Sequence, residues 1–311
     1  MAQTFFVTGA TGTQGGYVTR QLLDASQKVH VISRNPDGEA SRDLEALGVK
    51  VFKGDFSNVE SMKLAATGCI GAFINVSPDM TDPLGELKQI RNVIEACQKA
   101  GVKKVVQSAV GGLQSIKEKV EKDESMIHIR SFILNKLAVE EAIQNAGFES
   151  WTILHYSRLL NTYVAPFSTI MFPTLTTEQT IKTALRPNKK QWVLDPFDIG
   201  RIAKEAFLNE SGKFKNIAVD LSSAELTFQD IVNLMNAALG DTKVKLYYYT
   251  VEEVQQLVAS GNPFVVAELQ TNSTESIVDR SLMAKLGFEP TEPGEFFKRE
   301  IEKFRQAIGE N

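Results

Sequence analysis

Short apolar runs alternate with amphipathic stretches through the first half of the chain. Six runs predict buried strands, at residues 4–8, 29–33, 49–52, 71–76, 105–108 and 151–155. Between most of them, apolar residues recur at helical spacing, as in Leu84, Leu87 and Ile94. Because a strand, a helix and a second strand form a right-handed parallel crossover, this order predicts a doubly wound parallel α/β sheet in a domain that ends near residue 156.

The second half of the chain has a weaker pattern. Residues 157–190 are rich in Thr, Pro, Phe and Leu and show no clean period. Thr227 and Asp230 predict a capping box at the start of a helix. Further strands are expected at 216–221 and 243–249, and further helices at 201–207, 251–260 and 293–308. We therefore expect a nucleotide-binding domain at 1–156 and a smaller α/β lobe for a substrate or partner at 157–311, of which about 192–221 return to the first domain.

Charge and composition exclude several classes of protein. The chain has 311 residues, and its 34 Lys and Arg against 38 Asp and Glu give a net charge of -4, which argues against nucleic acid as a direct partner. Cys69 and Cys97 lie in apolar text, which predicts buried reduced thiols and no metal site. No apolar run reaches the ~18 residues of a membrane span. Residues 1–4 have no basic segment, so we expect no signal peptide and a place in the cytoplasm or nucleus.

The segment from Thr8 to Gly16 carries the clearest chemical signal. It follows the first predicted strand, opens the first predicted helix and spaces its glycines as G-x-x-G-x-x-G. A pyrophosphate needs bare main-chain N–H groups at a helix N-terminus, with glycines for the tight turn, the close approach and the packing of helix on strand. The predicted dinucleotide site comprises Gly9, Thr11, Gly12, Thr13, Gln14 and Gly15. The alternative is a tight strand-to-helix turn without a ligand.

The end of the second predicted strand bears on the choice of cofactor. An acidic residue there would bind the ribose 2′-hydroxyl of NAD, but the sequence reads Ser33-Arg34-Asn35-Pro36. Arg34 can form charge-assisted bonds to a 2′-phosphate, so NADP(H) is preferred over NAD(H). The nearby Asp37 and Glu39 weaken this preference, and a solvent-facing Arg34 is the alternative.

Polar residues also follow the third, fourth and fifth predicted strands. Asp55 and Phe56 could border the adenine ring, although Asp55 could equally cap the next helix. Since ligands bind at the carboxyl ends of parallel strands, the middle of the cofactor is expected beside Asn75, Val76 and Ser77. Ser108 at the end of the fifth strand faces the same region.

Five segments of the sequence resemble the NmrA-like family of atypical short-chain dehydrogenase/reductases, which includes isoflavone-reductase-like enzymes and a mammalian NADP(H) sensor. They are Thr8–Gly16, Ser33–Pro36, Gly54–Asp55, Lys136–Glu141 and Asp198–Gly200. The resemblance covers nearly the whole chain. It implies an N-terminal Rossmann domain, a smaller C-terminal lobe that closes a cleft, and NAD(P) binding.

One departure from the wider superfamily concerns proton transfer. Typical reductases carry Tyr-x-x-x-Lys before the sixth strand, with the tyrosine as the acid, whereas this sequence has Phe132 and Lys136. Similarity to the isoflavone-reductase-like branch implies that Lys136 is the acid/base, assisted by Ser108, His155 or Tyr156. The alternatives are that Lys136 only anchors the cofactor ribose and that His155 is only a wall residue at the strand end.

The first hypothesis from these features is an NADP(H)-dependent oxidoreductase. Its expected substrate is a small apolar carbonyl or conjugated compound, as in secondary metabolism. The missing tyrosine favours a second one, a non-catalytic NADP(H) sensor or transcription co-regulator with a protein partner. A third is a scaffold that retains the cofactor for non-redox chemistry. Residues Leu159–Leu175 are expected to line a lipophilic substrate pocket or else to form core, and the place of His128 is left open.

Overall fold

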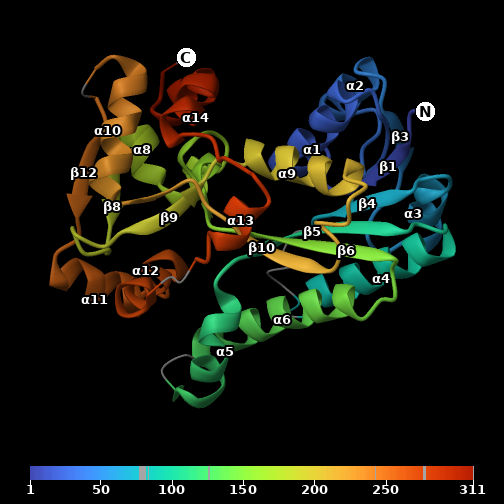
Figure 1. Ribbon diagram of the computed structural model, residues 1–311. Coiled ribbons are helices and arrows are strands. Elements are labelled where there is room, and N and C mark those ends of the chain that lie inside the picture. Colours follow the sequence, from blue (N-terminus) through green and yellow to red (C-terminus); the bar gives the residue numbers. More distant parts are fainter. Residues whose placement is uncertain (77–81, 83, 125–126, 242, 276–277, 311) are drawn as a thin grey trace. The chain divides into compact units, whose positions relative to one another are not determined.

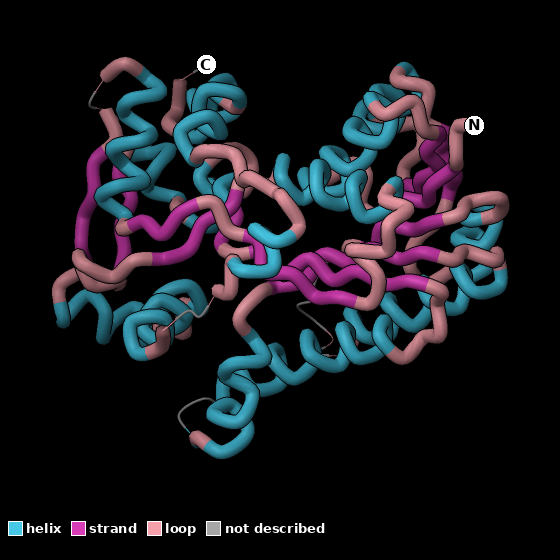
Figure 2. The backbone as a smooth tube through the Cα atoms, in the orientation of Figure 1, coloured by secondary structure: helices cyan, strands magenta, loops and turns pink. Residues whose placement is uncertain are grey.

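The computed structural model describes residues 1–76, 82, 84–124, 127–241, 243–275 and 278–310, and it divides into two compact units (Figures 1 and 2). The first unit comprises Met1–Tyr156, Pro196–Leu221 and Asp279–Phe288. The second unit comprises Ser157–Asp195, Ser222–Val278 and Glu289–Asn311. None of the helices in the described ranges combines the length and the apolar character that crossing a bilayer requires.

A seven-stranded sheet with the order β10-β6-β5-β4-β1-β2-β3 forms the centre of the first unit. All of its neighbouring strands pair in parallel. The strands are β1 (Thr4–Val7), β2 (Lys28–Ser33), β3 (Lys50–Lys53), β4 (Gly71–Ile74), β5 (Lys104–Val110), β6 (Ser150–Tyr156) and β10 (Ile217–Leu221). The chain moves outward from β1 in one direction to β3 and in the other from β4 to β10, so the predicted doubly wound α/β fold is confirmed, with its switch point beside β1.

Helices cover both faces of this sheet (Figure 1). The helices of the first unit are α1 (Thr13–Asp24), α2 (Glu39–Ala46), α3 (Val59–Ala66), α4 (Gly85–Lys99), α5 (Leu113–Lys122), α6 (Ile127–Gln144), α9 (Phe197–Leu208) and α13 (Ser281–Lys285). Helix α1 packs on α9 on one face, and α4 packs on α3 and α6 on the other. The core beneath α3, α4 and α6 includes Phe6, Ile74, Ile90, Val105 and Ile143. Because strands buried on both faces need apolar residues on both, they read as continuous apolar runs.

The second unit is built from short elements around its own core. Its strands are β7 (Arg158–Leu159), β8 (Thr180–Thr183), β9 (Gln191–Leu194), β11 (Ala224–Leu226) and β12 (Lys245–Tyr248), arranged as β11-β9-β7 and β12-β8. Its helices are η2 (Leu160–Tyr163), α7 (Ser168–Met171), α8 (Pro173–Glu178), α10 (Phe228–Leu239), α11 (Val251–Ala259), α12 (Pro263–Ser273), α14 (Pro293–Arg299) and α15 (Ile301–Ala307). The capping box of Thr227 and Asp230 at the start of α10 is confirmed.

The second half of the structure differs from the sequence prediction in two places. The tail is two helices that meet at Glu300, and α12 had no counterpart in the sequence prediction. In the segment expected to line a pocket or form core, Tyr163 stacks on Phe172 with ring centroids 5.1 Å apart, and both are buried in the core of the second unit. These rings support the core alternative, although Phe167 in the same segment is exposed.

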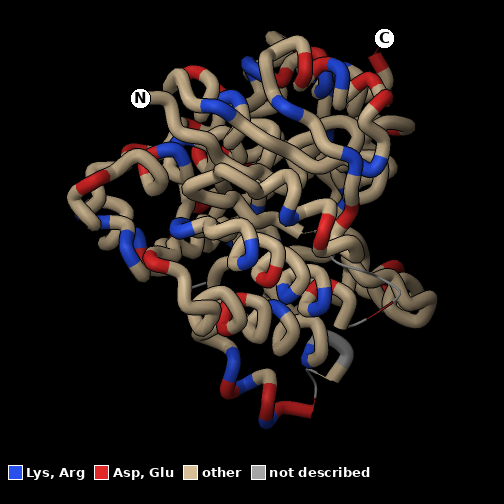
Figure 3. Tube along the Cα trace, turned by 90° about the vertical axis from the view of Figure 1, so that its right-hand side faces the viewer, with Lys and Arg blue, Asp and Glu red and all other residues tan. Residues whose placement is uncertain are grey.

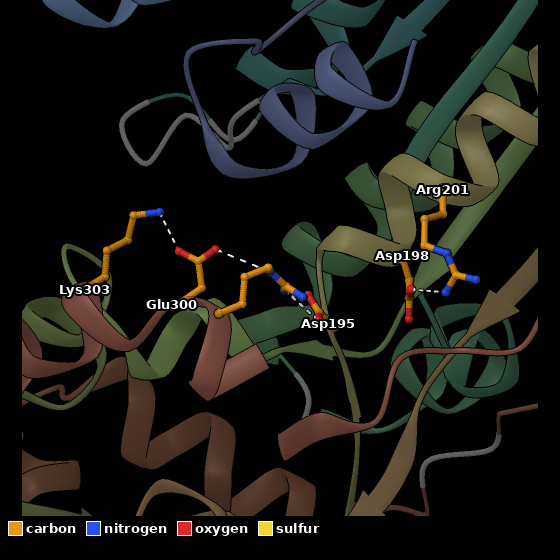
Figure 4. Close-up of polar contacts among 6 residues, drawn as sticks. Asp195, Asp198, Arg201, Glu300 and Lys303 are labelled. Carbon is orange, nitrogen blue, oxygen red and sulfur yellow. Dashed lines mark hydrogen bonds and ion pairs between the residues drawn. The ribbon is translucent and has the colours of Figure 1, made fainter. Parts of the chain in front are cut away.

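Ion pairs between charged side chains occur in both units (Figure 4). In the second unit, Arg299 donates from Nη2 to both oxygens of the buried Asp195, at 2.6 and 2.7 Å, and Lys303 pairs with Glu300 at 2.6 Å. In the first unit, Arg201 pairs with the buried Asp198 one turn away on α9, at 2.8 Å. Acidic and basic residues are otherwise intermingled along the trace, as one view shows (Figure 3).

Candidate functional site

The loop between β1 and α1 is a tight turn that leads directly into a helix N-terminus. Gly9 adopts a positive φ of 64°, which favours glycine, and its carbonyl accepts from the N–H of Gly12 at 3.0 Å. A Cβ at Gly15 would lie 2.5 Å from the carbonyl oxygen of Gly9 and 2.6 Å from that of Thr8, so a side chain does not fit there. The N–H groups at the start of a helix point outward along its axis, which makes this turn a suitable place for an anion.

Thr8 fastens this loop to the end of β4. Its buried hydroxyl accepts from the N–H of Asn75 at 2.8 Å and lies 3.0 Å from the carbonyl oxygen of Asn75. The main-chain N–H of Thr8 also donates to the carbonyl of Phe73 at 3.0 Å. These bonds join the loop to the residues at the end of β4, where Val76 is buried, whereas Thr11 in the loop is exposed. Ser77 lies outside the described residues.

Arg34 is exposed immediately after β2, on the same carboxyl edge of the sheet. Nearby Asp55 follows β3 and accepts from the N–H and the hydroxyl of Ser57 at 2.7 and 2.5 Å. These two bonds lower the pKa of Asp55, and the charge of Arg34 acts in the same direction. The N-cap of α3 is Asn58, whose side chain accepts from the N–H of Ser61 at 3.0 Å, so the capping role considered for Asp55 is wrong.

Two further predicted residues have a structural environment. Phe56 is half-buried and packs against the core of the first unit. The Ser33 hydroxyl, at the end of β2, accepts from the hydroxyl of Ser41 at 2.8 Å and from the N–H of Asn35 at 3.2 Å, which stiffens the turn that carries Arg34.

A second group of polar side chains meets at the start of α1. Ser108 from β5 donates its hydroxyl to the amide oxygen of Gln14 at 2.5 Å. Tyr156 is the last residue of β6, and its main-chain carbonyl accepts from the N–H of Gly111 at 2.9 Å. Burial raises the pKa of the Tyr156 phenol to about 12, the carboxylate of Glu86 adds to this rise, and the amide of Gln14 opposes both. At neutral pH Tyr156 is therefore a neutral phenol.

Lys136 forms a buried ion pair with Glu86. Its Nζ lies 2.7 Å from Oε1 of Glu86 in the first turn of α4, and only 10% and 7% of the two side chains is exposed. Asn135 donates to the other oxygen of Glu86 at 3.4 Å, and the ring of Phe132 lies 5.4 Å from the ammonium. Glu86 was not predicted from the sequence as a site residue. Its only sequence signal was an acid in the first turn of a predicted helix, which is a common stabilising arrangement.

His155 lies on the other face of the sheet from Tyr156, because successive residues of a strand alternate. Its Nε2 lies 3.0 Å from Glu140 on α6, and its Nδ1 lies 3.2 Å from Asp220 on β10. Burial opposes a charge on the ring, but the two carboxylates outweigh it and raise the pKa of His155 to about 9.

The structure thus joins the predicted residues Ser108 and Gln14 by a hydrogen bond and pairs Lys136 with Glu86, while His155 is held by Glu140, one turn after Lys136 on α6, and by Asp220. The side chain of His128 lies outside the described residues. Cys69 and Cys97 are buried free thiols, and burial raises the pKa of Cys69 to about 12. Within the described ranges, no three His, Cys, Asp or Glu side chains converge as metal ligands would.

The fold and this arrangement of residues define a protein of the Rossmann type, and comparison with known families makes the class specific. A model of the NmrA-like family matches residues 1–284, so the chain belongs to the NmrA-like family. An NmrA-like family domain-containing protein of Dictyostelium discoideum is 27% identical over 270 residues, which is 82% of each chain. The NmrA-like family domain-containing oxidoreductase FrzB of Cladobotryum sp. is 40% identical over 111 residues, or 33% of this chain and 32% of that relative. The chain therefore matches about a third of that relative's length.

Two solved structures share the fold. Triphenylmethane reductase from Citrobacter sp., complexed with NADP(H), is 23% identical, with a TM-score of 0.71 over 95% of this chain and 99% of that one. The negative transcriptional regulator NmrA, in complex with NAD, is 17% identical, with a TM-score of 0.70 over 100% of this chain and 98% of that one. One of these neighbours is named as a reductase and the other as a regulator, so fold alone does not decide between the two functions.

Proposed function

We propose that the chain is an NADP(H)-dependent oxidoreductase that exchanges hydride with a small apolar carbonyl or conjugated substrate. The observation that supports the proposal is the glycine-rich turn of Gly9, Gly12 and Gly15, called the cradle below. A Cβ at Gly15 would lie 2.5 Å from the carbonyl oxygen of Gly9. Glycine at this position lets the start of α1 pack directly on the turn, and the main-chain amides in the first turn of α1 would then face the pyrophosphate. The oxidoreductase in the name of the Cladobotryum relative and the NADP(H) complex of the Citrobacter reductase support the same function.

The residues beyond the cradle would divide the rest of the cofactor among them. Exposed Arg34 would bind the 2′-phosphate, Asp55 would accept from the adenine amine, and Asn75 would border the middle of the cofactor. Bound NADPH would supply the hydride. Lys136, which the family resemblance implies as acid/base or ribose anchor, is held in place by Glu86.

The first test is calorimetric titration of the wild-type chain and of Gly15→Ala with NADPH. Because the added methyl meets main-chain carbonyls that cannot move without displacing the loop, we expect the affinity to fall at least about tenfold. Circular dichroism of the same samples would show whether the variant is folded. Undiminished affinity in folded Gly15→Ala would contradict the cradle.

The second test concerns the choice between the two cofactors. In Arg34→Asp the guanidinium is replaced by a carboxylate that repels the 2′-phosphate and can bind the ribose hydroxyls. We expect the ratio of NADPH to NADH affinity to fall by about 10- to 100-fold, since a charge-assisted contact contributes about 1.5–3 kcal/mol. An unchanged ratio would show that Arg34 does not select the cofactor. Arg42→Asp, an acid placed on α2 next to the same turn, is the charge control.

A second candidate function is a non-catalytic NADP(H) sensor that acts through a protein partner. Two features favour it: Phe132 replaces the usual acid, and the ammonium of Lys136 is already engaged by Glu86. Tight binding of NADPH without its oxidation by any ketone, enone or quinone would support the sensor. Substrate-dependent loss of nicotinamide absorbance would support the enzyme.

A further inference from the structure

The turn after β2 folds back on the helix that follows it. The carbonyl of Asn35 accepts from the N–H of Gly38 at 3.2 Å, which closes a turn of four residues with Pro36 at its second position. Gly38 is the N-cap of α2, and a Cβ there would lie 2.7 Å from the side-chain nitrogen of Asn35. The start of α2 therefore packs closely against the residue that follows Arg34.

Ser41, the third residue of α2, binds this turn on both sides of Arg34. Only 2% of Ser41 is exposed, and its hydroxyl lies 2.8 Å from the Ser33 hydroxyl and 2.8 Å from the Asn35 carbonyl oxygen. Its single proton serves one of these contacts at a time. While that proton goes to the Asn35 carbonyl, Ser33 can donate its own proton to Ser41, so both contacts persist. The N–H of Asn35 completes the set by donating to the Ser33 hydroxyl at 3.2 Å.

These bonds fix the main chain next to the side chain that would select the cofactor. Arg34 is exposed, and ordering its long side chain on an anion costs conformational entropy. A main chain that is already held at residues 33 and 35 adds little to that cost, because the turn is organised before the anion arrives. NADH has no 2′-phosphate, so this organisation should favour NADPH alone.

We propose that Ser41 is a positioning residue for the 2′-phosphate of NADPH, and that it acts by holding the turn that carries Arg34. The proposal rests on the role of Arg34 in the proposed function above. It makes the preference for NADPH over NADH depend on a buried hydroxyl of α2 as well as on the guanidinium itself.

The test begins with Ser41→Ala, which removes the hydroxyl and suits a helix, since alanine is the strongest helix former. The wild type and the variant are each titrated with NADPH and with NADH by calorimetry. We expect the ratio of NADPH to NADH affinity to fall about three- to tenfold, as for the loss of one hydrogen bond, while the affinity for NADH stays the same.

Ser115→Ala is the matched control. Ser115 is the third residue of α5, and its hydroxyl donates to the carbonyl of Gly112 at 2.7 Å, so the substitution removes an equivalent bond from the first turn of another helix of the first unit. The ratio of the two affinities should stay at the wild-type value. An equal fall in Ser41→Ala and Ser115→Ala would overturn the role of Ser41.

A double-mutant cycle with Arg34→Ala shows whether Ser41 acts through Arg34. If it does, Ser41→Ala should lower the ratio of NADPH to NADH affinity in the wild-type background and leave it unchanged in the Arg34→Ala background. Equal falls in the two backgrounds would mean that Ser41 acts on α2 independently of Arg34, and would overturn the proposal.

The remaining outcomes distinguish this role from the proposed function. If the wild-type chain binds neither coenzyme, the cofactor-dependent function and the role of Ser41 fall together. If Arg34→Ala leaves the ratio unchanged, the assignment of Arg34 to the 2′-phosphate is wrong, and that of Ser41 with it. If Arg34→Ala lowers the ratio, but Ser41→Ala leaves it unchanged or weakens both coenzymes alike, only the role of Ser41 is overturned.

Discussion

At the scale of single residues, His155 shows how an environment turns a candidate acid into a structural cation. Glu140 and Asp220 hold its two ring nitrogens, at 3.0 and 3.2 Å, and Asp220 also accepts from the N–H of Asp279 at 2.9 Å. The imidazolium thus joins α6, β6 and β10. The same residue on an open strand end would be a titrating group near neutrality, as the sequence alone suggested.

The raised pKa of His155 predicts a dependence of stability on pH. The pKa of the folded state, about 9, exceeds the ordinary value of 6.5, so the stabilisation is fully present below pH 6.5 and is lost as the pH rises through 9. The shift corresponds to about 3 kcal/mol. We expect the free energy of unfolding in urea to fall between pH 7 and 9.5 more steeply in the wild type than in His155→Gln.

His30 offers the matched control for this measurement. Its Nδ1 lies 2.7 Å from the carbonyl oxygen of Ala65, and burial lowers its pKa. Since His30 is neutral above pH 7 in both the folded and the unfolded state, His30→Gln should keep the slope of the wild type. Parallel slopes for the wild type and His155→Gln would show that no charge is held at His155.

At the scale of elements, the packing of α1 on α9 explains why residue 200 is a glycine. In the sequence, Gly200 was only part of a family motif. A Cβ at Gly200 on α9 would lie 2.8 Å from the main-chain carbonyl carbon and oxygen of Tyr17 on α1. The two helices therefore approach so closely that main chain meets main chain. Because α1 also carries the first-turn amides of the cradle, this contact fixes the direction in which they point.

Gly200→Ala should therefore lower stability. Forcing a methyl into this contact is expected to cost about 1–3 kcal/mol, measured as the free energy of unfolding in urea. Gly294→Ala is the matched control, because Gly294 is also helical and its added Cβ would lie 3.5 Å from Leu234, at ordinary contact distance. An equal effect of the two substitutions would mean that the α1–α9 contact is not as close as described.

At the scale of the whole molecule, prediction from the sequence succeeded where structure is local. The cradle of Gly9, Gly12 and Gly15 lies within one turn of chain, and the parallel sheet follows from strand and helix alternation. The pair of Lys136 and Glu86 joins residues 50 positions apart, and the bond of Ser108 to Gln14 joins residues 94 apart. Such contacts depend on which helix packs where, and periodicity does not contain that information.

The remaining prediction concerns the ion pair of Arg299 with the buried Asp195, which stabilises the second unit. Arg299 binds Asp195, whose carboxylate is completely buried, with both contacts at 2.7 Å or less. Arg299→Met would leave that carboxylate in the interior without its cation, at a cost of about 3–5 kcal/mol in the free energy of unfolding. All residues of the proposed cofactor site belong to the first unit, so the variant, titrated by calorimetry well below its melting temperature, should keep the NADPH affinity of the wild type. Loss of affinity in the folded variant would mean that residues of the second unit take part in holding the cofactor.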